Sequence, residues 1–197
     1  MLDFVIAKVI NNFAHGTFLD KISWLISYRL FLIGAIAVIV LIILWKDKKY
    51  GKYLFIAFII AAAMHGLFNE VLWKEVFADD IWFRERPYVA HPDDIFPIGN
   101  LNTDNSFPSN HLSFLTLSIV VICYFYRKRW VWFSSVFAII LMSLSRIHNG
   151  MHYPTDILGG IITGMLYGII GIEICLLYTS DAADDLLCVD LGGRRII

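Results

Sequence analysis

The stretch Arg146–Asp156, RIHNGMHYPTD, joins two strongly apolar segments and decides how the rest of the chain is interpreted. The segment before it is Trp130–Ile147, and the segment after it begins at Pro154. Proline suits the first turn of a helix, because its ring fixes a helical φ and its missing N–H would have no partner there. The stretch is therefore predicted to be a polar turn between two helices. It carries an arginine, a histidine and a carboxylate at fixed offsets.

The composition is that of a membrane protein. Of the 197 residues, 58% are hydrophobic, and the formal net charge is −1. A membrane-spanning helix needs about 20 mostly apolar residues. Five segments meet or approach that length: Trp24–Trp45, Lys52–Trp73, Ser109–Tyr126, Trp130–Ile147 and Pro154–Leu177. We expect an all-α, polytopic transmembrane helix bundle of about five spans. The near-zero charge gives no reason to expect a nucleic-acid partner.

The two ends of the chain differ from these spans. Leu2–Phe18 is amphipathic and is broken by two asparagines and a glycine, so we interpret residues 1–23 as a helix lying in the membrane interface. A sixth, partial span is the alternative. Residues 24–174 then form the transmembrane domain. Residues 175–197 change character abruptly, and the codons allowed for Cys175–Asp184 resemble a transposase adapter used in sequencing libraries. We interpret this tail as non-native, with a polar cytoplasmic tail as the alternative.

Basic residues indicate which side of the membrane each connection occupies. Lysines gather in Lys46–Lys52, and a second basic cluster is Arg127–Arg129. The positive-inside rule places both connections in the cytoplasm. The long connection Phe77–Pro108 and the turn His148–Tyr153 are then expected on the extracytoplasmic side.

Two further stretches in these outer connections carry groups that suit a phosphate. In Phe107–His111, FPSNH, proline disfavours helix at the residue before it, and Ser109 is a good N-cap for the next span. Free N–H groups at a helix N-terminus bind phosphate, the Ser109 hydroxyl can add a donor, and His111 would lie in the first turn. An ordinary capped helix with an interfacial histidine is the alternative.

In Phe83–Tyr88, FRERPY, Arg86 precedes a proline and is expected to be extended at the end of a helix. Its guanidinium can bind two phosphate oxygens, and Arg84 is a second cation nearby. Contacts between these arginines and lipid head groups are the alternative.

The turn after the fourth span supplies a possible nucleophile. His152 lies just before the predicted last helix, and Asp156 lies four residues later, so the two can approach on one helix face. The carboxylate can accept from one ring nitrogen, which fixes the tautomer and leaves the other nitrogen free to attack. Arg146 closes the preceding span and reaches the same outer pocket. The alternative is an aspartate that only satisfies helix-start N–H groups beside an unrelated histidine.

These motifs, in this order, resemble the type 2 phosphatidic acid phosphatase superfamily. The resemblance covers roughly Lys52 to Ile174, and it rests on Arg86-Pro87, on Pro108-Ser109-Asn110-His111, and on Ser145-Arg146 followed by His152 and Asp156. FRERPYV most resembles the bacitracin-resistance type of undecaprenyl-diphosphate phosphatase. One position departs from the pattern. The family usually has a lysine seven residues before its Arg-Pro arginine, where this chain has Asp79. Lys74 and Arg84 are the nearest basic residues, and Arg84 is a candidate substitute.

The resemblance implies a metal-independent phosphohydrolase without a cofactor. His152 would attack phosphorus to form a phospho-histidine, Asp156 would orient it, and His111 would protonate the leaving oxygen and then activate water. The phosphate-binding groups would be Arg86, Ser109, Arg146 and Arg84. A metal site is the alternative, and its candidate ligands are His91, His111, His148 and His152.

The resemblance also implies the substrate and the location. We expect undecaprenyl diphosphate as substrate, a bacterial inner-membrane location with the site facing outward, and no required protein partner. Phosphatidylglycerophosphate or phosphatidic acid hydrolysis is the enzymatic alternative, and a small membrane transporter is the non-enzymatic one. Two further expectations concern packing. His65 should face another helix or a cavity, and Gly159, Gly160 and Gly164 should allow close helix contact.

Overall fold

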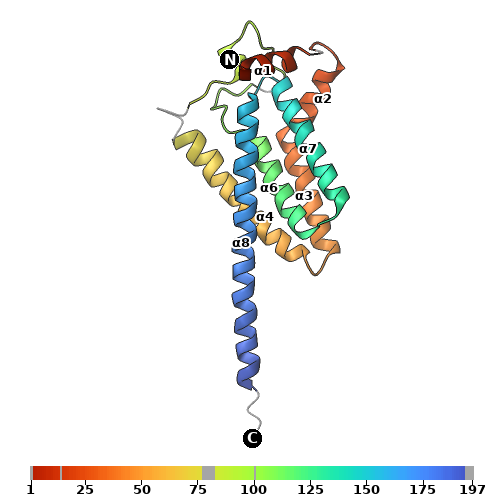
Figure 1. Ribbon diagram of the computed structural model, residues 1–197, viewed down its shortest axis with the longest axis vertical. Helices are drawn as coiled ribbons and strands as arrows, with labels where there is room; N and C mark the ends of the chain where they lie inside the picture. Colours follow the sequence, from red (N-terminus) through yellow and green to blue (C-terminus); the bar gives the residue numbers. More distant parts are fainter. Residues whose placement is uncertain (1, 14, 77–82, 100, 194–197) are drawn as a thin grey trace.

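The computed structural model describes residues 2–13, 15–76, 83–99 and 101–193, and these ranges form helices and connections without a strand. The elements, in chain order, are α1 (Leu2–Asn12), α2 (Phe18–Ile26), α3 (Arg29–Lys46), α4 (Gly51–Met64), the π-helical η1 (His65–Val76), α5 (Pro87–Ala90), α6 (Asn110–Phe125), α7 (Arg129–His148) and α8 (Pro154–Gly193). Figure 1 shows α3, α4, α6, α7 and the first half of α8 as one bundle, with α1 lying across its end.

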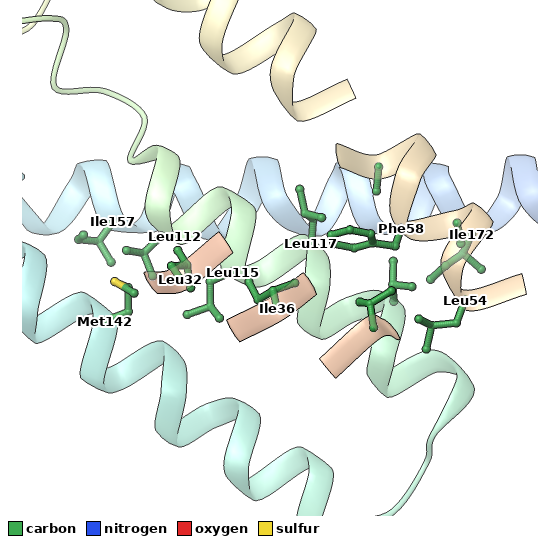
Figure 2. Close-up of a cluster of buried hydrophobic side chains, with 14 of the residues drawn as sticks. Leu32, Ile36, Leu54, Phe58, Leu112, Leu115, Leu117, Met142, Ile157 and Ile172 are labelled. Carbon is green, nitrogen blue, oxygen red and sulfur yellow. The ribbon is translucent and has the colours of Figure 1, made fainter. Parts of the chain in front are cut away.

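The predicted multi-pass bundle is confirmed, with one change in the lengths of its helices. Four helices are long and apolar enough to cross a membrane: Arg29–Lys46, Gly51–Trp73, Arg129–His148 and Pro154–Tyr178. The expected third span is the 16-residue helix α6, which is shorter than the others. Helix α6 is the central helix, and Figure 2 shows Leu112, Leu115 and Leu117 lying among side chains of the neighbouring helices. Its packing partners are therefore mainly protein.

The N-terminal segment forms two helices where the sequence suggested one. Helix α1 ends at Asn12, and Gly16 follows with a φ of +79°, a left-handed conformation that glycine adopts without strain. Thr17 then caps α2, because its side chain accepts a hydrogen bond from the Leu19 amide. The expected first span, which was placed from Trp24, accordingly begins only at Arg29.

Glycines bring α6 and α8 into close contact, as predicted. A Cβ atom at Gly160 would lie 2.5 Å from the carbonyl oxygen of Ser109, and one at Gly164 would lie 2.4 Å from that of Ser113. Neither approach is possible for a residue with a side chain unless a backbone shifts. Both helices begin at the same end of the bundle, so this close contact also sets the separation of their first turns (Figure 1).

The two basic connections lie together at the opposite end of the bundle (Figure 1). The Tyr126 hydroxyl donates to Asp47 Oδ2 at 2.6 Å, and the rings of Tyr50 and Phe125 are in contact. The bond from Tyr126 lowers the pKa of Asp47. Burial together with the neighbouring Asp47 raises the pKa of Tyr126 to about 12. Both basic clusters therefore lie at the same end of the helix bundle.

Candidate active site

Three distant segments meet at the end of the bundle away from the basic connections. The Ser109 amide donates to the Asp156 carbonyl at 3.1 Å, which joins the start of α6 to the first turn of α8. The Ser106 amide donates to the Arg84 carbonyl at 2.8 Å, which adds the segment before α5. The three motifs recognised in the sequence therefore occupy one site.

His152 is held in one orientation and one tautomer. Its imidazole is buried, and Nδ1 lies 2.8 Å from the Ser106 carbonyl oxygen. A carbonyl can only accept, so Nδ1 carries the proton. Nε2 then has a lone pair, and it faces the guanidinium groups of Arg146 at 3.2 Å and Arg86 at 3.4 Å. Guanidinium groups can only donate, so the contacts on both sides of the ring agree on this tautomer.

Asp156 supports His152 from behind without bonding to it directly. The carboxylate is fully buried, and its Oδ2 lies 3.9 Å from His152 Nδ1, beyond hydrogen-bond distance. Oδ2 instead accepts from the Ser106 hydroxyl at 2.6 Å and from the Tyr153 amide at 2.8 Å. Asp156 was expected to accept the hydrogen bond from the imidazole, but the Ser106 carbonyl accepts it instead. Asp156 accepts from the Ser106 hydroxyl and from the Tyr153 amide just before α8.

Arg86 is the best-anchored cation of the cavity. Its side chain is 2% exposed, Nη2 pairs with Asp104 Oδ1 at 2.6 Å, and Nη1 donates to the Met151 carbonyl at 3.0 Å. Its backbone is extended, as predicted, but it caps the start of the short helix α5 and does not end a helix. Asp104, which the sequence analysis did not single out, holds this guanidinium in the absence of another anion.

Ser109 Oγ, at the N-cap of α6, and Arg146 Nε are buried, and neither has a hydrogen-bond partner among the residues that the structure describes. An unsatisfied buried polar atom costs about 1–3 kcal/mol. Such atoms therefore indicate that something else bonds there when the protein works. Ser109 and the start of α6 were predicted to face a phosphate, and the Ser109 hydroxyl lies where it can donate to an anion at that helix start.

A cavity of about 440 Å³ lies beside Arg146. The polar side chains that line it include Arg86, Asp104, His111, Arg146 and His152, together with the ion pair between Arg29 and Glu70. It is also lined by apolar side chains, including Leu30, Leu32 and Ile33 of α3 and Phe114 of α6. Leu30 is 66% exposed, so the cavity reaches the outer surface of a membrane-spanning helix. The cavity therefore suits an amphiphile whose head group is anionic.

Arg84 takes a different place from the one predicted. It does not line the cavity, and its guanidinium pairs with Asp156 Oδ1 at 2.7 Å, pairs with Asp3, and lies 4.1 Å from the centroid of the Tyr153 ring. Two carboxylates occupy its donors, so its position does not support a role in holding phosphate. Asp79 and the side chain of Lys74 lie outside the described part of the chain.

The other histidines are dispersed. His91 packs against the ring of Phe4, and His148 donates to the Ile10 carbonyl and pairs with Asp20 at 3.0 Å. The four-histidine metal site considered from the sequence is therefore not assembled. Among the residues that the structure describes, no group of three or more His, Cys, Asp or Glu side chains is placed to hold a metal ion.

One further polar residue predicted to face a neighbour is His65. His65 lines the cavity, and its Nδ1 lies 3.2 Å from the Ser113 hydroxyl of α6, which confirms that it faces another helix. Sequence reasoning missed Ser106, Asp104 and Asp3. The first two lie within five residues of Ser109, so proximity to a recognised motif was the available signal. Asp3 is remote in sequence and gave none.

The site and fold together define a class. A buried imidazole whose unprotonated Nε2 faces two guanidinium groups, in a membrane-spanning helix bundle, is an arrangement that can hold an anion such as phosphate. Residues 52–178 match the PAP2 superfamily, and the chain belongs to this family.

Relatives of known name agree with this membership. The chain is 31% identical to undecaprenyl-diphosphatase BcrC of Bacillus subtilis (strain 168), over 85% of this chain and 81% of that protein. It is 28% identical to the bacitracin transport permease protein BcrC of Bacillus licheniformis, over 61% of this chain. That match spans only 53% of the B. licheniformis protein.

Two solved structures share the fold. Aquifex aeolicus LpxE superposes with a TM-score of 0.67 at 20% identity, covering 88% of this chain and 96% of that one. A PAP2 type phosphatidylglycerolphosphate phosphatase from Bacillus subtilis superposes with a TM-score of 0.64 at 20% identity, covering 100% of this chain and 88% of that one.

Proposed function

We propose that this chain is a membrane lipid-phosphate phosphatase that hydrolyses undecaprenyl diphosphate to undecaprenyl phosphate and inorganic phosphate. The observation that carries the proposal is the orientation of His152. Its unprotonated Nε2 faces Arg86 and Arg146 in a cavity that is also lined by apolar side chains of the membrane-spanning helix α3. A lipid with an anionic head group combines the same two kinds of surface.

The first chemical step forms a phospho-histidine. Nε2 of His152 bonds to the terminal phosphorus while the bond from that phosphorus to the bridging oxygen breaks. His111, which lines the same cavity, donates a proton to the departing oxygen. Arg86 and Arg146 neutralise the charge on the non-bridging oxygens, and Ser109 with the N-terminus of α6 supplies further donors.

The second step restores the enzyme. His111, now neutral, accepts a proton from a water molecule whose oxygen attacks the phosphorus. The N–P bond breaks, its electron pair returns to Nε2, and inorganic phosphate leaves. The proton on Nδ1 stays with the ring throughout, held by the Ser106 carbonyl. Each group therefore returns to its starting state.

Two observations support the substrate and the side of the membrane. Relatives named undecaprenyl-diphosphatase in Bacillus subtilis and Sulfolobus acidocaldarius, at 31% and 25% identity, support a lipid diphosphate. The basic connections lie at the end of the bundle opposite the site (Figure 1), which supports a site on the extracytoplasmic side of a bacterial inner membrane.

Phosphate release from a panel of lipids tests the proposal. Detergent-purified protein would receive undecaprenyl diphosphate, phosphatidic acid and phosphatidylglycerophosphate at matched mole fractions, with His152→Ala as the control. We expect the highest kcat/KM on the diphosphate. A higher kcat/KM on phosphatidic acid or phosphatidylglycerophosphate would mean that this lipid is the preferred substrate, with the proposed chemistry unchanged. No release above the control from any of the three would overturn the phosphatase itself.

A further inference from the structure

The N-terminal helix α1 reaches the back of the active site. Asp3, in its first turn, accepts from the Thr155 amide at 3.1 Å and from the Thr155 hydroxyl at 2.6 Å, and it pairs with Arg84. Arg84 in turn pairs with Asp156, which is 0% exposed. A residue more than 150 positions away in sequence is therefore two contacts from the carboxylate behind the nucleophile.

These contacts set the charge behind the imidazole. Asp3, Arg84 and Asp156 form a chain of alternating sign with one net negative charge. Burial raises the pKa of the Asp3 carboxyl, but the hydrogen bonds from Thr155 and Arg84 outweigh this and leave its pKa lowered. Asp3 is therefore ionised at neutral pH. Without it, Arg84 would cancel the charge of Asp156, and the rear cluster would be neutral.

We propose that Asp3 is a positioning residue of the active site, acting through Arg84 and Asp156 on the nucleophile His152. It holds the guanidinium in the geometry that leaves Asp156 bonded to Ser106, the residue whose carbonyl fixes the imidazole. It also preserves a negative charge behind the ring as positive charge develops on it during phosphoryl transfer. The inference rests on the proposed histidine chemistry and extends it to a helix outside the family motifs.

The same helix offers a control that separates positioning from anchoring. Lys8 of α1 pairs with Asp94 at 2.6 Å, so this contact ties α1 to the outer connection without touching Asp156. Asn11 also bonds to this connection, through the carbonyl of Phe96. If α1 served only to hold this connection in place, loss of the Asp3–Arg84 pair and loss of the Lys8–Asp94 pair would lower activity to a similar extent.

The experiment compares Asp3→Asn, Asp3→Glu and Asp94→Asn in the full chain. We expect Asp3→Asn to lower kcat on the order of tenfold with KM little changed, as for other residues that orient a catalytic group. Asp3→Glu should recover most of the loss, because it keeps the charge. Asp94→Asn should keep the wild-type kcat. In an Arg84→Gln background, Asp3→Asn should add little further loss, since the two residues act in series.

Several results would overturn the inference. Equal losses from Asp3→Asn and Asp94→Asn would show that α1 is only an anchor. A fully additive loss in the Arg84→Gln background would show that Asp3 does not act through Arg84. All rates are measured relative to wild type on whichever lipid phosphate the wild type hydrolyses best. A wild type that hydrolyses none would instead overturn the proposed function, and the two failures are therefore distinguishable.

Discussion

The surroundings of the two ring nitrogens of His152 differ in charge. We call the side of Nε2 the cavity face and the side of Nδ1 the rear face. On the cavity face, Nε2 meets the guanidinium groups of Arg86 and Arg146. On the rear face, Nδ1 meets the Ser106 carbonyl, with the Asp156 carboxylate behind it. The cavity is therefore positive where an anion must arrive, and the rear is negative where positive charge on the ring must be supported.

Arginines that are near each other in sequence can have different roles when they lie on opposite faces of this ring. Arg84 and Arg86 are two residues apart in sequence, and both were expected to bind phosphate. Arg86 lies on the cavity face, whereas Arg84 lies on the rear face between two carboxylates. The difference lies in what surrounds each guanidinium. The predictions below remove parts of each face, in order of expected effect.

Replacing the ring removes both faces at once. His152→Ala should lower kcat by about 10⁴-fold or more, because its Nε2 is the nucleophile of the proposed mechanism. Phosphate release from the lipid substrate measures this, and trapping of labelled phospho-enzyme should fail in the variant. Appreciable turnover by purified His152→Ala protein would mean that another residue, or water directly, is the nucleophile.

Removing one cation weakens the cavity face. Arg146→Gln should lower kcat by about 10²–10³-fold, the usual effect of losing one donor to a developing oxyanion. Arg127→Gln, in the basic connection at the other end of the bundle, is the matched control and should change nothing. If both variants behaved alike, the charge of the whole protein and not the local contact would be responsible.

Neutralising the carboxylate weakens the rear face. Asp156→Asn should lower kcat by about 10–100-fold with KM nearly unchanged. The loss should be smaller than the ~10⁴-fold seen where a carboxylate bonds directly to the catalytic histidine, because here the Ser106 carbonyl holds the ring. A loss as large as that of His152→Ala would indicate that Asp156 bonds to the ring directly during turnover.

A substitution in the close contact between α6 and α8 should lower the stability of the fold that holds both faces in place. Gly164→Ala places a Cβ atom 2.4 Å from the Ser113 carbonyl oxygen. Such overpacking costs about 1–3 kcal/mol and should lower the Tm in detergent. Gly34→Ala on α3 is the control, because nothing lies within 4 Å of its added Cβ. Equal Tm values for the two variants would show that this contact relaxes freely.

The smallest effect is expected at the far end of α8, remote from both faces. The family match ends at Tyr178, and Cys175 is buried in the core. We keep the proposal that the tail is non-native, and residues 179–197 lie beyond both of these features. Deleting residues 179–197 should leave kcat and KM unchanged. A gene from an independent source that encodes the same tail, or a loss of activity on deletion, would contradict this proposal.

The sequence by itself determined the class of fold and most of the residues that line the site, but not Ser106, Asp104 or Asp3. Apolar segments of membrane-spanning length predict a helix bundle, because the backbone can satisfy its hydrogen bonds in a bilayer only within such elements. The lysines and arginines of two connections predicted which ends lie together. The motifs around Arg86, Ser109 and His152 identified the phosphate chemistry, because those residue types are local and their spacing is fixed by short segments.

Only the tertiary structure decided which partner each of those residues has. Whether Asp156 or the Ser106 carbonyl accepts from His152 depends on a difference of about an ångström between distances of 3.9 and 2.8 Å. The opposite placements of Arg84 and Arg86, and the arrival of Asp3 from the N-terminal helix, depend on packing between segments far apart in the chain. Hydrogen bonds and ion pairs act over a few ångströms, whereas sequence spacing constrains only neighbours along one segment.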